Sequence, residues 1–113
     1  KSIAIGNPAD GFQALEVIRD TGGWGAAVPD EEILDAVRLL AETEGIFTEP
    51  AGGTTLAATR RLIETGRIPR DEPIVVCVTG NGYKTAEVMQ GQMAVEPVPL
   101  GRSYAAFEAW MGR

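Results

Sequence analysis

The side chains best placed to do chemistry lie in the sequence Thr-Gly-Asn-Gly-Tyr-Lys at residues 79–84. The apolar run at residues 74–78 precedes them and predicts a strand that is buried on both faces, as in a parallel sheet. A hydroxyl at the end of such a strand, that of Thr79, points into the crevice where open α/β sheets hold ligands. The glycines let the backbone approach a flat or anionic ligand, although a plain strand-to-helix turn uses the same residues. A dinucleotide fingerprint does not fit, because its third glycine would fall at Thr85.

Two further segments are candidates for a binding site. Residues 49–54, Glu-Pro-Ala-Gly-Gly-Thr, open a predicted helix with small residues, so that several backbone N–H groups are available to an anion or a cofactor. Tight packing of Gly52 and Gly53 between a helix and a sheet explains the same pattern. Residues 3–8, Ile-Ala-Ile-Gly-Asn-Pro, either line a site or only turn from a strand into a helix.

The residue types that are absent narrow the chemistry. The chain has no histidine and a single cysteine, which excludes Ser-His-Asp and Cys-His arrangements and the usual zinc sites, so we predict no metal ligand. Only Lys1 and Lys84 carry an amine that could form a Schiff base. Cys77 lies inside the apolar run and is predicted to be a core residue. A lone cysteine allows no internal disulfide and favours the reducing cytoplasm.

Charge and hydropathy limit the partners. Ten Lys and Arg are outnumbered by sixteen Asp and Glu, and the net charge of -6 opposes binding to nucleic acid. The apolar runs are far shorter than the roughly 20 residues that a membrane-spanning helix requires. The first residues do not form a secretory signal, and the absence of an initiator Met indicates a cut or processed product.

The elements that must position these motifs are mostly helices. Apolar spacing, acidic first turns and glycine stops predict helices at residues 11–21, at 33–45 after an acidic turn, and from 49–50 to about 65, with a closing helix capped by Ser103. Beside the strand at 74–78, weak extended segments occur at residues 24–28, 46–48 and 94–98. The predicted fold is α/β, a three-layer, partly parallel sheet flanked by helices. Its strands are too few for a complete sheet, so the missing ones are expected in another segment.

The three motifs together resemble those of threonine synthases. Residues 79–85 are similar to the family's Thr-Gly-Asn-Gly-Leu-Lys, residues 49–53 to its Glu-Pro-Ala element and residues 5–8 to its Ile-Gly-Asn-Pro, in the same order and at similar intervals. The resemblance covers roughly residues 3 to 88. It implies an incomplete part of a fold-type II pyridoxal phosphate enzyme, with residues 1–113 as a single C-terminal segment and the upstream catalytic portion absent.

The resemblance also assigns site residues. Thr79 matches the residue whose hydroxyl hydrogen-bonds the pyridine nitrogen of pyridoxal phosphate, and a neutral hydroxyl moderates the ring as an electron sink because it holds no proton on that nitrogen. Glu49 occupies the place of an acidic residue near the ring. Thr79, Gly80 and Glu49 are therefore the predicted cofactor-binding residues. Tyr83 departs from the family's usual Leu, which puts the packing behind this turn in doubt.

The implied reaction converts O-phosphohomoserine and water to threonine and phosphate. The family's Schiff-base lysine and glycine-rich phosphate loop belong to upstream sequence, and Lys84 aligns with a non-catalytic lysine. No catalytic residue is therefore assigned in this segment, and the isolated chain is expected to be inactive. Expected partners are a small amino-acid substrate, the upstream part of the same enzyme and a second copy in a homo-oligomer.

Two alternatives stay open. Threonine dehydratase, cysteine synthase and cysteate synthase share the implied fold and cofactor, and this segment holds little that fixes the leaving group. A non-catalytic α/β interaction module is the alternative from another class. Sequence upstream of Lys1 would separate them, because only an enzyme needs the lysine motif and the glycine-rich loop.

Overall fold

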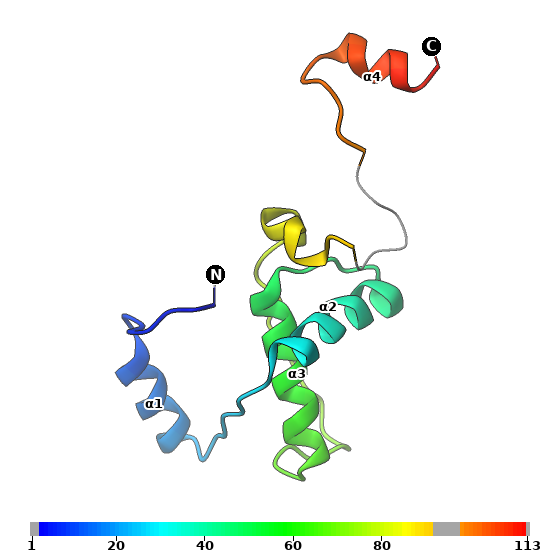
Figure 1. Ribbon diagram of the computed structural model, residues 1–113. Coiled ribbons are helices and arrows are strands. Elements are labelled where there is room, and N and C mark those ends of the chain that lie inside the picture. The colour runs from blue at the N-terminus through cyan, green and yellow to red at the C-terminus, as the bar shows by residue number, and fades with distance from the viewer. Residues whose placement is uncertain (1–2, 92–97, 113) are drawn as a thin grey trace.

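The computed structural model describes residues 3–91 and 98–112, and this part of the chain folds into helices joined by extended segments. The elements are α1 (Gly11–Asp20), α2 (Asp30–Glu44), α3 (Pro50–Glu64), the 3₁₀-helix η1 (Gly82–Met89) and α4 (Tyr104–Trp110) (Figure 1). The predicted α-helices are confirmed, each with bounds within a few residues of those expected. The 3₁₀-helix was not predicted, since its sequence indicated only a turn.

The helix ends follow the signals in the sequence. Gly45 ends α2 with a φ of 68°, and Gly66 follows α3 with a φ of 69°, a left-handed conformation that glycine adopts without steric cost. Pro50 occupies the first turn of α3. The side chain of Ser103 accepts a hydrogen bond of 3.2 Å from the backbone N–H of Ala106, which confirms the predicted cap of α4.

The core lies where α2 and α3 pack against each other. Ile33 and Val37 of α2 are buried against Ala57 of α3, and the ribbons cross closely in Figure 1. Gly53 allows this approach, because a Cβ atom there would lie 2.6 Å from the carbonyl oxygen of Ile33. Gly53 thus permits tight packing, but the predicted partner was wrong, because Gly53 faces helix α2 and not a sheet.

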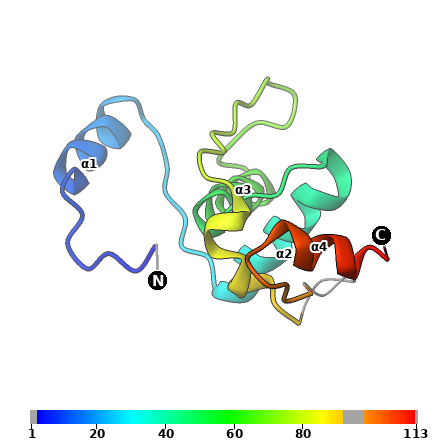
Figure 2. The same ribbon diagram turned by 90° about the horizontal axis from the view of Figure 1, so that it is seen from above.

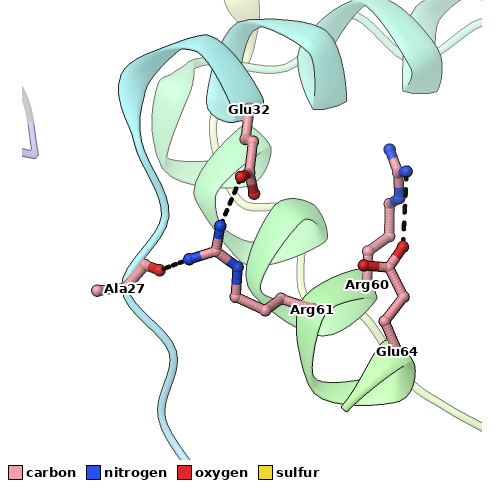
Figure 3. A network of polar contacts seen from close by, with 5 residues as sticks. All are labelled: Ala27, Glu32, Arg60, Arg61 and Glu64. Carbon is pink, nitrogen blue, oxygen red and sulfur yellow. Dashed lines mark hydrogen bonds and ion pairs between the residues drawn. The ribbon is translucent and has the colours of Figure 1, made fainter.

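A polar contact fixes the other end of this helix pair. The guanidinium of Arg61 on α3 donates to the backbone carbonyl of Ala27 and to the carboxylate of Glu32, at 2.5 Å for the latter (Figure 3). Arg67 lies over the Trp24 ring, 3.7 Å from its centroid. These contacts hold the segment that enters α2 against the far end of α3.

The predicted sheet does not form within residues 3–91 and 98–112. Residues 74–78 are extended but unpaired, with Val75 90% exposed, so the prediction of a buried central strand ending at Thr79 is wrong for this chain. The prediction that Cys77 is a core residue is wrong for the same reason. Residues 24–28 also lack strand partners, and the segment predicted at 94–98 falls mostly outside the described residues.

A strand is stable only when neighbouring strands pair with its N–H and C=O groups. The chain offers only one strongly strand-forming run, so no such neighbour is available.

The outer helices keep their apolar faces uncovered. Neither α1 nor α4 has a buried residue, and Phe12 is 80% exposed. Figures 1 and 2 show α1 well away from the α2–α3 pair. Figure 1 also shows α4 apart from this pair. The radius of gyration is 18.2 Å, whereas a compact domain of this length has about 13 Å. The exposed faces agree with the expectation that a sheet is missing, and association through them stays a prediction. In the described segments, no helix is both long and apolar enough to cross a bilayer.

Thr85 provides a test of the packing around η1. Its hydroxyl oxygen is buried without a hydrogen-bond partner in the structure, beside the side chains of Val37, Phe47 and Met89. An unsatisfied buried hydroxyl is destabilising, so Thr85→Val is expected to raise the free energy of unfolding by about 1 kcal/mol. Urea unfolding followed by circular dichroism measures the change.

The matched control for Thr85→Val is Thr59→Val, which removes a hydroxyl that donates to the Thr55 carbonyl at 2.8 Å. Removing this satisfied hydroxyl is not expected to stabilise the chain. An equal loss of stability in both variants would contradict the packing of Thr85.

Candidate functional site

Two of the predicted motifs meet through their backbones. Thr48 and Asn81 form an isolated antiparallel bridge. The N–H of Glu49 donates to the carbonyl of Gly80 at 3.1 Å, and the N–H of Gly82 donates to the carbonyl of Phe47 at 3.0 Å. The two turns therefore lie side by side, with Glu49 in contact with Gly80, the residue after Thr79, and a ligand shared by Glu49 and Thr79 stays a prediction.

Thr48 holds the two turns together from the inside. It is 1% exposed, and its hydroxyl donates to the carbonyls of Gly80, at 3.0 Å, and Glu49, at 3.3 Å. A Cβ atom at Gly52 would collide with this hydroxyl, so a glycine is needed there. Sequence reasoning missed Thr48, which was treated as part of an extended link. The sequence marks Thr48 only by its position directly before the Glu-Pro-Ala element, and this position does not predict a contact with residue 80.

The carboxylate of Glu49 is the charged centre of the site. Its side chain is 12% exposed, and its Oε2 atom lies 3.0 Å from the Nζ atom of Lys84, which is 66% exposed. A Cβ atom at Gly80 would collide with the same carboxylate. A carboxylate largely removed from water requires a partner, and Lys84 supplies it. The sequence assigned Lys84 no role beyond being the lysine of the turn motif.

Aromatic packing supports the outer side of the turn. The rings of Phe47 and Tyr83 meet edge to face, with centroids 5.3 Å apart and planes at 86°. The side chain of Asn81 accepts a hydrogen bond of 2.9 Å from the N–H of Tyr83. A Cβ atom at Gly82 would lie 2.6 Å from the Phe47 ring. Tyr83 therefore contacts this ring but stays 82% exposed, so the contact covers little of the tyrosine side chain.

The motif at residues 3–8 is only partly close to this region. Ile3 and Ala4 line an apolar hollow of about 240 Å³ together with Pro50 and Val88. Asn7 and Pro8 instead line a separate hollow against α1. The structure thus brings residues 49–54 and 79–84 together. The end of the motif at residues 3–8 lies away from them.

The two turns bring three kinds of polar group together. Thr79 is exposed, and the Glu49 carboxylate lies against the backbone of the adjoining Gly80. These groups supply a hydroxyl, peptide groups and one negative charge, which is a set for hydrogen bonding rather than for metal binding. Among the described residues no group of three His, Cys, Asp or Glu side chains is arranged to hold a metal ion.

Comparison with known proteins gives the class to which this chain belongs. Residues 1–80 match the family described as pyridoxal-phosphate dependent enzyme, and the chain is a member of that family. The matched range contains the Glu49 turn and the segment leading to Thr79 and Gly80. The family depends on pyridoxal phosphate.

Three relatives with high similarity to this chain are threonine synthases. The chain is 49% identical over 83 residues to the threonine synthase of Methanocaldococcus jannaschii, covering 74% of this chain and 20% of that protein. It is 44% identical over 87 residues to the threonine synthase of Bacillus sp. (strain ULM1), covering 77% of this chain and 25% of the relative. The threonine synthase of Halalkalibacterium halodurans is 39% identical over 106 residues, covering 94% and 30% respectively. The chain thus spans less than a third of the length of these relatives.

Proposed function

We propose that this chain is the C-terminal segment of a threonine synthase that converts O-phosphohomoserine and water to threonine and phosphate. The observation that carries the proposal is the contact between the Glu49 and Gly80 turns, which brings together the residues predicted to bind the cofactor. The similarity to three threonine synthases supports the choice of reaction. The complete enzyme is then a polypeptide of the relatives' length that contains this segment.

The residues of this site fit one edge of pyridoxal phosphate. The cofactor, when bound, supplies an electron-withdrawing ring that activates carbon atoms of an amino-acid substrate. Thr79 would donate a hydrogen bond to the pyridine nitrogen, and its neutral hydroxyl adds no charge there. Gly80 has no side chain, which leaves room for the Glu49 carboxylate against its backbone, and this carboxylate would border the ring. The covalent lysine and the groups that bind the cofactor phosphate are assigned to the rest of the complete enzyme.

The remaining features of the proposal concern assembly. We assign the complete enzyme a fold-type II architecture, in which residues 74–78 pair with strands of the remaining polypeptide. The exposure of this β-branched run in the isolated chain supports that assignment. Uncovered apolar faces on α1 and α4 favour a homo-oligomer, and the single free thiol of Cys77 favours the cytoplasm.

Spectral titration with pyridoxal phosphate tests the cofactor role of Thr79. Thr79→Ala in the complete enzyme is expected to keep the covalently bound cofactor and weaken its affinity by the value of one hydrogen bond, about 0.5–1.5 kcal/mol. Thr43→Ala is the matched control, because this hydroxyl on α2 donates only to the Leu39 carbonyl. Equal affinities in wild type and Thr79→Ala would remove Thr79 from the site.

The isolated chain gives a second arm of the same experiment. It is expected to show neither turnover nor the absorbance of a covalently bound cofactor, because neither of its lysines is assigned to that bond. Borohydride reduction followed by peptide mapping locates any attached cofactor. A reduced adduct on Lys84 together with turnover by the isolated chain would overturn the proposed function.

A further inference from the structure

Lys84 and Glu49 form an unequal ion pair. The Nζ and Oε2 atoms are 3.0 Å apart, but the lysine side chain is 66% exposed and the glutamate side chain only 12%. An exposed pair of charges adds little stability on its own. The carboxylate, however, is held away from water and would be left with a strong need for a partner if the ammonium were removed. The pair therefore matters more for the position of Glu49 than for that of Lys84.

The fold places Lys84 at this point by means of the turn itself. The Asn81 side chain accepts from the Tyr83 N–H at 2.9 Å, and the Asn81 carbonyl accepts from the Lys84 N–H at 3.2 Å. These bonds start η1 directly after the bridge between Thr48 and Asn81. The backbone of Lys84 is thus tied to the segment that carries Glu49, and its side chain has only to reach across to the carboxylate.

The two oxygens of the carboxylate have different neighbours. Oε2 faces the ammonium of Lys84, whereas Oε1 lies against the backbone of Gly80, where a Cβ atom would overlap it. Holding one oxygen fixes the rotation of the whole carboxylate group. Lys84 thereby determines how the other oxygen is presented beside Gly80 and Thr79.

We propose that Lys84 is a positioning residue, which holds the Glu49 carboxylate against Gly80 at the cofactor edge. The inference rests on the proposed function, because it requires the cofactor ring to lie beside this carboxylate. Lys84 has neither of the environments that activate a lysine amine as a nucleophile, since it is not enclosed in an apolar pocket and its charge faces an opposite charge. Its chemistry at the site is electrostatic, and it forms no bond to the cofactor.

The test uses Lys84→Met and Lys84→Arg in the complete enzyme, with Arg60→Met as the matched control. Arg60 forms an exposed pair with Glu64 at 3.8 Å on α3, so its removal deletes one positive charge away from the site. A misplaced group at a reaction centre costs up to about a hundredfold in rate. Lys84→Met is expected to lower kcat about tenfold and to shift the absorbance maximum of the bound cofactor. Lys84→Arg keeps the ion pair and is expected to restore both, while Arg60→Met changes neither.

The combination with Glu49→Gln identifies the route of the effect. If Lys84 acts through Glu49, the double variant loses no more activity than Glu49→Gln alone, because the two residues then belong to one interaction. An effect of Glu49→Gln without any effect of Lys84→Met would overturn the positioning role and leave the proposed site intact. Wild-type behaviour of Glu49→Gln would overturn the positioning role and the cofactor role of Glu49 together. Lower thermal stability of Lys84→Met with an unchanged cofactor spectrum and kcat would show a purely structural contact, and this also overturns the proposal.

Discussion

Alanine at Gly80 is expected to lower the kcat of the complete enzyme by about a hundredfold while the free energy of unfolding changes little. A Cβ atom at this position would overlap the Glu49 carboxylate and lie 2.6 Å from the Cγ atom of the same side chain. The Glu49 side chain must turn out toward water, where its charge is solvated, and the carboxylate then leaves both Gly80 and the ammonium of Lys84.

Two other glycines separate this effect from a general response to alanine. Gly25→Ala meets open space, so activity and stability are both expected to stay near those of the wild type. Gly82→Ala would place its methyl group 2.6 Å from the ring of Phe47, which cannot swing away as easily as a carboxylate. We expect this variant to lose stability first. Steady-state kinetics and thermal unfolding of the three variants give the comparison, and full activity in Gly80→Ala would contradict the proposed geometry.

The helices could be predicted because their determinants are local. Apolar spacing, the acidic residues before Ile33, Pro50 and the glycines at 45 and 66 all act within a few residues of the element they define. The structure accordingly reproduces these helices and their ends. The 3₁₀-helix after Asn81 escaped prediction because its two short turns are joined at Thr85 by a residue with non-helical angles, which no apolar period reveals.

The failure of residues 74–78 to form the predicted strand could not be foreseen, because strand formation depends on partners that are distant in sequence. The β-branched run at residues 74–78 has a strong preference for a sheet, but a preference produces a strand only where other strands offer hydrogen-bond partners. In this chain Val75 and Cys77 are exposed instead. The sequence correctly indicated too few strands, and that same shortage leaves the one good strand without a partner.

The site was predicted as a set of residues but not as a set of contacts. The motifs placed Glu49 and Thr79 at two turns, and the structure joins these turns through Gly80. The hydroxyl of Thr48 and the ammonium of Lys84 were missed as determinants. Both bind across a gap of more than thirty residues in sequence, as the separation of Thr48 from Gly80 shows. Such a contact depends on how the two turns pack, and no local pattern encodes it.

Valine at Gly53 is expected to lower the free energy of unfolding by about 3 kcal/mol, because it forces α2 and α3 apart. A Cβ atom there would lie 2.6 Å from the carbonyl oxygen of Ile33 and 2.7 Å from a methyl carbon of Val37. A backbone carbonyl inside a helix cannot rotate away, so the two helices must separate along the buried part of the core. Part of this loss is offset, because glycine has a poor helix propensity and its replacement stabilises the helix. The gain in helix stability is about 1 kcal/mol when alanine replaces glycine and less when valine does.

Steric overlap and helix propensity act in opposite directions at Gly53, so a series of variants with increasing side-chain size is needed to separate them. Gly53→Ala gains most of the propensity and meets the smaller overlap, so its stability is expected to lie between those of the wild type and Gly53→Val. Arg60→Val on the exposed side of α3 gives the cost of a β-branched residue without any overlap, about 0.5 kcal/mol. Urea unfolding followed by circular dichroism orders the variants. If Gly53→Val lost no more stability than Arg60→Val, the close approach of α2 and α3 at Gly53 would be wrong, and the propensity term alone would describe this position.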